Sequence, residues 1–104
     1  MRIRWSPRAR DQVREIFEYI ARDRPSAAEA ILERFLERVD LLKEFPLQGP
    51  AWGDGRQEDL REVIVEGHRI VYRIGPDHIS MLSVRHTRMK PDDLGDVSEG
   101  DLEE

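Results

Sequence analysis

Residues 60–86 contain three segments with strand character, and the connections between them are too short to hold a helix. The segment 60–65 reads LREVIV, and only Glu66 and Gly67 separate it from the segment 68–74, HRIVYRI. A Gly-Pro-Asp turn then leads into the segment 78–86, HISMLSVRH. A two-residue connection that contains glycine is typical of a hairpin between antiparallel strands, because glycine readily adopts the positive φ of such turns. The sequence therefore predicts three consecutive antiparallel strands.

The first half of the chain predicts one short strand followed by two helices. The RIRW segment at 2–5 alternates apolar and charged residues, as a strand does. A Ser-Pro pair at 6–7 begins a helix that runs to about residue 22, with apolar residues at helical spacing. Pro25 begins a second helix that Pro46 ends, and the short connection predicts an antiparallel helical hairpin. The order β-α-α-β-β-β indicates an α+β fold, a small antiparallel β-sheet backed by an α-helical hairpin.

Residues 46–59, PLQGPAWGDGRQED, form a loop in this interpretation because glycine, proline and polar residues dominate them. Trp52 is the one large aromatic residue in this segment. An aromatic side chain in such a loop more often closes an edge of the core than binds a ligand. We therefore expect Trp52 to pack against the core.

Length and composition favour a single cytoplasmic domain. A chain of 104 residues suffices for one modest core. It has no cysteine, which excludes a disulfide framework and a thiolate zinc site and suits a reducing compartment. The first residues lack the apolar region of a signal peptide, and no apolar run approaches the ~20 residues that span a bilayer.

The net charge of −5 is unevenly distributed along the chain. Residues 92–104 hold seven of the 22 acidic residues and none of the 17 Lys and Arg, so residues 1–91 carry a net charge of +2. We expect a folded domain over 1–91 and an acidic, disordered C-terminal tail over 92–104, because like-charge blocks usually stay solvated. The tail either solubilises the protein or acts as a nucleic-acid mimic or an internal cover for the basic sheet.

Cationic residues on the predicted strands are the main candidates for a binding site. Strand alternation places Arg69 and Arg73 on the face away from the helices, although a one-residue bulge would exchange the faces. If Arg61 shares that face near the hairpin, it forms with Arg69 a site for an anion, and His86 and Arg88 lie beside it. Arginines on solvated strands are also common and protect sheet edges from aggregation. A purely structural role therefore remains an alternative.

Other kinds of chemistry have weaker support in the sequence. No His, Asp and Glu residues have metal-ligand spacing, and neither G-x-G-x-x-G nor a P-loop pattern is present. The serines lack any motif of a nucleophile. We therefore expect no metal and no cofactor.

Several short motifs occur in an order that is similar to one known family. They are a Trp-Ser start, Y-I-A-x-D-x-P-x-A-A, F-P-x-x-G, an arginine that opens the first hairpin strand, R-I-V-Y-R, and a final V-x-H-x-R. Together they span about residues 3–88. In this order and spacing the chain resembles the ParE/RelE toxin superfamily of type II toxin–antitoxin systems, and within it the ParE-like branch. The resemblance implies the same α+β fold and a cognate antitoxin, whose segment buries apolar side chains in a helix–sheet groove and brings acids to the toxin's arginines.

Two activities follow from the resemblance. RelE-like members cut mRNA on the ribosome with sheet lysines and arginines and a tyrosine or histidine near the C-terminus, whereas ParE-like members are associated with DNA gyrase poisoning and are not nucleases. For a ribosome-dependent mRNA endonuclease the matching residues are Arg61, Arg69, His86 and Arg88, with His86 as acid or base. The hairpin lysines of that set are absent.

We therefore expect a non-catalytic toxin that inhibits DNA gyrase. Its predicted target- and antitoxin-binding residues are Arg61, Arg69, Arg73, His86 and Arg88. Alanine at both Arg61 and Arg69 is expected to weaken toxicity without unfolding the domain. The alternatives are the RelE-like mRNA endonuclease and a degenerate, non-toxic member that only binds its antitoxin.

Overall fold

In the part of the chain that the structure describes, two helices and four strands follow one another in the predicted order. The structure is a computed structural model, and it describes residues 1–53, 55 and 59–90. The elements are β1 (Arg2–Trp5), α1 (Pro7–Asp23), α2 (Pro25–Asp40), the 3₁₀ turn η1 (Leu41–Lys43), β2 (Leu60–Val65), β3 (His68–Ile74) and β4 (His78–His86). The second helix ends as an α-helix at Asp40, and one 3₁₀ turn continues it toward Pro46. The expected α+β class and element order are confirmed.

The strands form one sheet in the order β1-β4-β3-β2. The pairs β2–β3 and β3–β4 are antiparallel, as the short turns require. In contrast, β1 lies parallel to β4, with Arg2 opposite His78 and Trp5 opposite Met81. The sheet is therefore mixed rather than antiparallel throughout, since the chain enters β4 in the same direction in which it left β1.

Local sequence fixes where the first helix begins and how it is attached to the sheet. The buried Ser6 side chain accepts a hydrogen bond from the Ala9 N–H at 3.1 Å, as an N-cap does, and Pro7 occupies the first turn. The same hydroxyl donates to the Leu82 carbonyl at 3.2 Å. One serine thus caps α1 and ties it to β4.

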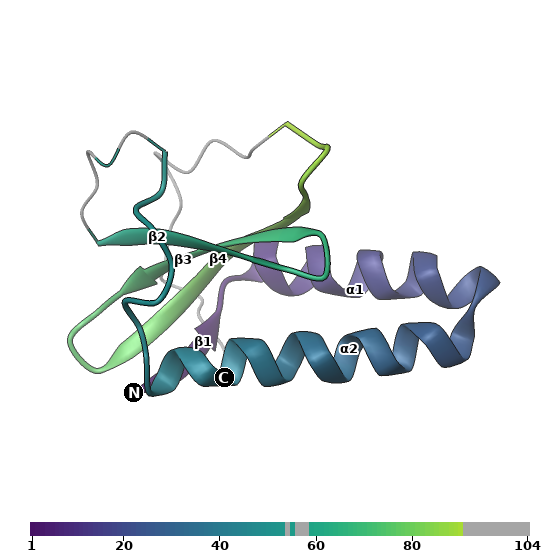
Figure 1. The fold of residues 1–104 in the computed structure, drawn as a ribbon, viewed down its shortest axis with the longest axis horizontal. Helices are drawn as coiled ribbons and strands as arrows, with labels where there is room; N and C mark the ends of the chain where they lie inside the picture. The colour runs from purple at the N-terminus through teal and green to yellow at the C-terminus, as the bar shows by residue number, and fades with distance from the viewer. Residues whose placement is uncertain (54, 56–58, 91–104) are drawn as a thin grey trace.

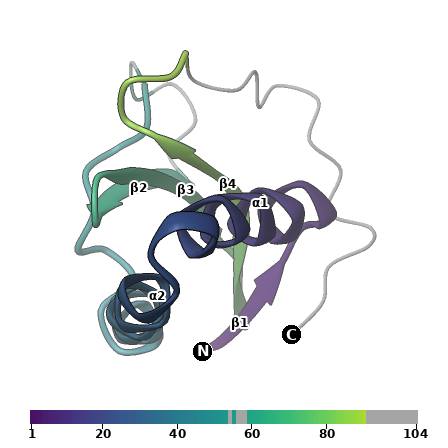
Figure 2. The ribbon, with the colours of Figure 1, turned by 90° about the vertical axis from the view of Figure 1, so that its right-hand side faces the viewer.

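The main core lies between the helical hairpin and one face of the sheet (Figures 1 and 2). Phe17 of α1 and Phe35 of α2 meet edge to face, with their ring centroids 5.7 Å apart. The sheet contributes alternate strand residues to this core, including the fully buried Ile70, Tyr72 and Met81. This arrangement leaves the other residues of each strand on the opposite face of the sheet.

A smaller cluster occupies that opposite face. Leu60, Val71 and Leu82 are buried there, and Trp52 packs against them, which confirms the expectation for this residue. The Trp52 N–H also donates to the Leu60 carbonyl at 3.0 Å, and Ala51 pairs with Arg61, so the loop covers the outer edge of β2. Covering an edge strand in this way limits aggregation.

An irregularity between β3 and β4 determines which β4 residues reach each core. The register shifts between Val71 and Tyr72, because Val71 lies opposite Ser83 whereas Tyr72 lies opposite Met81. Leu82 is the additional residue, and it turns to the smaller cluster. Simple strand alternation would place Leu82 on the same face as Val84, and the bulge is the reason that it does not.

Among the described residues, no helix is long and apolar enough to cross a membrane. The acidic residues 92–104 lie outside the described residues. Their expected disorder, and the domain boundary at residue 91, therefore stay predictions.

Candidate interaction surface on the sheet

Arginines from three strands lie on the sheet face away from the helices, and we call this set the arginine face: Arg4, Arg69, Arg73 and Arg85. Residues opposite one another in the register share a face. Arg4 of β1 and Arg73 of β3 both lie opposite Ser80 of β4, and Arg69 lies directly opposite Arg85. The predicted placement of Arg69 and Arg73 is therefore confirmed. The smaller apolar cluster lies on the same face, so cationic side chains border a packed centre.

Two of these arginines are held by acids of the same chain. The Arg69 Nε lies 3.5 Å from Glu62 Oε2, and the Arg73 Nε lies 2.9 Å from Asp59 Oδ2. Partly exposed pairs of this kind contribute little to stability, so a partner's carboxylate or phosphate can replace the internal acid at small cost. Arg69 and Arg85 place like charges directly opposite one another, and the Glu62 carboxylate paired with Arg69 lessens their repulsion.

Arg61 lies on the other face of the sheet. It is opposite Tyr72 of the main core, whereas Arg69 points away from that core. Its Nη1 donates to the Gly49 carbonyl at 2.7 Å and to the Leu47 carbonyl at 3.4 Å. The expectation that Arg61 and Arg69 share a face is therefore wrong, and the contacts of Arg61 are those of a loop anchor.

Tyr72 shares this anchoring role with Arg61. Its hydroxyl donates to the Pro46 carbonyl at 2.8 Å and accepts from the Gly49 N–H at 3.2 Å. Burial raises the pKa of the Tyr72 hydroxyl, which keeps it protonated and able to donate. A Cβ at Gly49 would lie 2.2 Å from the Glu62 carbonyl oxygen, so only glycine fits where the loop crosses the sheet.

Two histidines meet at the far end of the sheet. His68 and His86 are opposite in the register, and their rings pack edge to face with centroids 5.3 Å apart. His68 is 8% exposed and its Nδ1 lies 2.8 Å from the Glu66 carbonyl oxygen, which makes Nδ1 the donor. Burial lowers the pKa of His68, and the neighbouring His86 lowers it further. The sequence alone gives no sign of the role of His68, because its burial depends on packing between distant residues.

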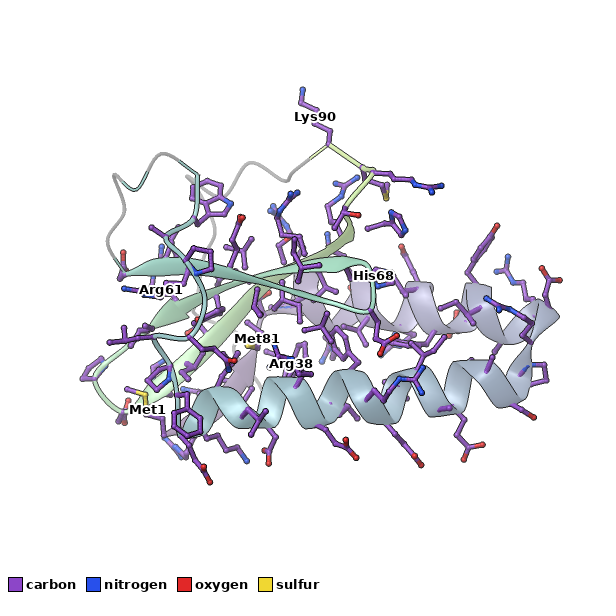
Figure 3. The ribbon with its side chains drawn as sticks, in the orientation of Figure 1. Met1, Arg38, Arg61, His68, Met81 and Lys90 are labelled. Atoms are coloured by element: carbon purple, nitrogen blue, oxygen red, sulfur yellow. The ribbon has the colours of Figure 1, made fainter. Side chains whose placement is uncertain are left out.

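A hollow of about 680 Å³ opens between β1 and α2, and we call it the β1–α2 hollow. Its apolar lining comes from Met1, Ile3, Trp5, Leu36 and Val39. Charged residues also line it, among them Glu33 and Glu37 of α2. Figure 3 shows Met1 beside the C-terminal end of α2. The basic residues Arg2 and Lys43 line it too, so the hollow combines apolar side chains, charged groups of both signs and the edge strand β1.

Comparisons with known proteins agree with this architecture. A family model described as "ParE toxin of type II toxin-antitoxin system, parDE" matches residues 3–91. The chain belongs to the ParE toxin family. It is 36% identical over 91 residues to the Sinorhizobium fredii protein named "Putative toxin Y4kP", a match that covers 86% of this chain and 91% of that protein.

The fold of this ParE-family chain also matches a solved structure. The structure is titled "Chromosomal ParDE TA system from P. aeruginosa", and the match has a TM-score of 0.68. It covers 83% of this chain and 95% of that one, at 19% sequence identity. At this identity the match concerns the fold, and it confirms the predicted architecture.

The residues predicted for the toxin's interactions do not form one cluster. Arg69 and Arg73 lie on the arginine face, whereas Arg61 and His86 lie on the helix side of the sheet near its opposite ends. Figure 3 labels Arg61 and His68, which lie toward opposite ends of the sheet, and His68 is the residue paired with His86. Arg88 is exposed beyond β4, and its N–H donates to His86 Nδ1 at 3.1 Å. Within the part of the chain that the structure describes, no three His, Asp or Glu side chains gather as metal ligands do.

Proposed function

We propose that this toxin arrests growth by binding DNA gyrase without catalysing a reaction, and that a cognate antitoxin neutralises it. Family membership supports the role as a toxin. The choice of a docking protein over a nuclease rests on one observation: Arg69 and His86 lie on opposite faces of the sheet.

The placement of the candidate nuclease residues argues against RNA cleavage by this set. Attack by a 2′-OH requires a base, an acid and cations within hydrogen-bond reach of one phosphate. Here the sheet itself separates Arg69 from His86. Arg61 lies opposite Tyr72 of β3 and His86 lies opposite His68, and these two β3 residues are four positions, about 13 Å, apart. These groups cannot meet around one phosphate in this fold.

The arginine face has the properties of a surface that docks on a protein. Arginine is enriched at protein interfaces because its planar guanidinium binds carboxylates in a bidentate manner. The buried cluster of Leu60, Val71 and Leu82 gives these arginines a rigid base. Acidic side chains on a gyrase surface would replace Glu62 and Asp59 as the partners of Arg69 and Arg73.

The antitoxin would use a different surface, the β1–α2 hollow. As an edge strand, β1 can pair with an added strand of a partner, and alternate side chains of that strand would enter the hollow. Leu36, which lines the hollow, is 46% exposed, and Phe45 beyond η1 is 58% exposed. Exposed apolar groups of this kind mark interaction sites.

Growth arrest is tested by inducing the chain in a bacterial host while chromosomal breaks and mRNA integrity are followed together. We expect double-strand breaks with intact mRNA. An R69Q/R85Q variant should lose most of the arrest, whereas R22Q/R24Q, which removes two exposed charges at the α1–α2 connection, should keep it. Cut mRNA with intact chromosomes would instead establish a ribosome-dependent endonuclease, and no arrest at all would establish a degenerate member.

Neutralisation is tested with a substitution in the hollow, Leu36→Arg. The substitution places a charged side chain among the apolar residues that line the hollow and does not alter the arginine face. We expect the variant to stay toxic when the cognate antitoxin is co-expressed, although the antitoxin should protect cells from the wild-type chain. Full protection from both would place the antitoxin elsewhere.

A further inference from the structure

We propose that the acidic segment 92–104 docks on the arginine face of its own chain and competes there with acidic ligands. The segment carries seven carboxylates and no basic residue, whereas residues 1–91 carry a net charge of +2. If the arginine face is the docking surface for the target, this contact regulates how tightly the toxin binds the target. The contact itself does not depend on the identity of the target.

The distribution of charge on the face favours such an occupant. Arg69 and Arg85 lie directly opposite one another, and Arg4 and Arg73 flank Ser80 further along β4. An extended acidic segment can place a carboxylate near each of these two positions, because several acids follow one another along it. Charge-assisted hydrogen bonds from guanidinium to carboxylate would then hold the segment on the face.

The segment begins in the right place and is long enough. β4 ends at His86, and Lys90 lies on the side of the sheet away from the helices (Figure 3). Thirteen residues can extend over about 40 Å, whereas the nine residues of β4 span about 30 Å. The segment is therefore long enough to reach both Arg85 and Arg73.

Apolar groups and the covalent connection add to the charge argument. Ile64, on the same face and opposite Arg69, is 54% exposed, and the segment carries Leu94 and Val97. Because the segment is attached to the sheet, its local concentration is in the millimolar range, so even weak contacts compete with a free ligand. Salt should weaken the contact, since the Debye length shortens from ~30 Å at 0.01 M to ~3 Å at 1 M.

A spin label tests the contact directly. The chain has no cysteine, so Ser98→Cys accepts a single nitroxide in the full-length protein. We expect the label to broaden the amide signals of Arg69, Arg73 and Arg85 at 50 mM NaCl and to leave α2 unaffected, with recovery at 500 mM NaCl. Broadening that is equal on both faces, or that does not respond to salt, would refute the docking.

A binding cycle tests the competition. The probe is a fluorescent peptide of twelve glutamates, and the comparison is with a full-length variant whose seven acids after residue 91 are Asn or Gln. We expect the neutralised segment to raise probe affinity about tenfold at 50 mM NaCl and by less than twofold at 500 mM NaCl. This gain should disappear in an R69Q/R85Q background and persist in the R22Q/R24Q background.

The two experiments separate this contact from the gyrase hypothesis. An equal gain in both arginine backgrounds would mean a general effect of net charge and would overturn the proposal. Salt-sensitive broadening at Arg69 and Arg85 without chromosomal breaks would leave the contact standing and refute gyrase as the target.

Discussion

The Tyr72 hydroxyl holds the loop after α2 against the sheet, and its removal should have a measurable cost. In Tyr72→Phe the ring still fills the core, but the Pro46 carbonyl and the Gly49 N–H lose their partner at 2.8 and 3.2 Å. Each neutral hydrogen bond contributes about 1 kcal/mol, so the free energy of unfolding should fall by about 2 kcal/mol. For a domain of this size that corresponds to a decrease in Tm of about 10 °C.

Thermal unfolding followed by circular dichroism measures this effect. Tyr19→Phe is the matched control, because Tyr19 is 70% exposed on α1 and its substitution should change the Tm very little. The raised pKa of Tyr72 adds a second signature: its stabilising effect is present below the ordinary tyrosine pKa near 10 and is lost as the pH rises further. Equal Tm values for the two variants would refute the anchoring role of the hydroxyl.

Two further predictions concern other parts of the fold. Gly49→Ala should destabilise the domain more than Tyr72→Phe, because its Cβ would lie 2.2 Å from a backbone oxygen, and a Tm within 2 °C of wild type would show that the loop can move aside. Because burial lowers the pKa of His68, its contribution to stability is present above the ordinary histidine pKa of about 6.5 and is lost on acidification. Urea unfolding at pH 7.5 and pH 5 should show this loss in the wild type and a smaller one in His68→Gln, and equal losses would exclude His68 as the cause.

Local signals were strong enough to predict the elements. α1 begins at Ser6 and Pro7 as expected, because the N-cap and the first-turn proline act within a single turn of helix. The hairpin at 66–67 was also predictable, and both of its residues have positive φ, 50° for Glu66 and 75° for Gly67. In each case, neighbouring residues determine the conformation.

The faces of the strands depend on distant contacts and were harder to predict. Alternation separates Arg61 from Arg69 only when the register of β2 and β3 is known, and that register places Arg61 opposite Tyr72. The bulge near Leu82 has no glycine to mark it. The pairing of β1 with β4 depends on packing through Ser6 and the core, which no short motif encodes.

That parallel pairing has a consequence for how the toxin forms in the cell. Arg2 meets His78 and Ser6 meets Leu82, contacts that join positions 76 residues apart. Contacts between such distant positions slow folding, because a long loop must close before they form. During synthesis β1 and α1 leave the ribosome first and must wait for β4 before the sheet can be completed. Both the β1–α2 hollow and the arginine face therefore arise only when nearly the whole domain has been made, so a partner that recognises either surface meets the finished toxin rather than the growing chain.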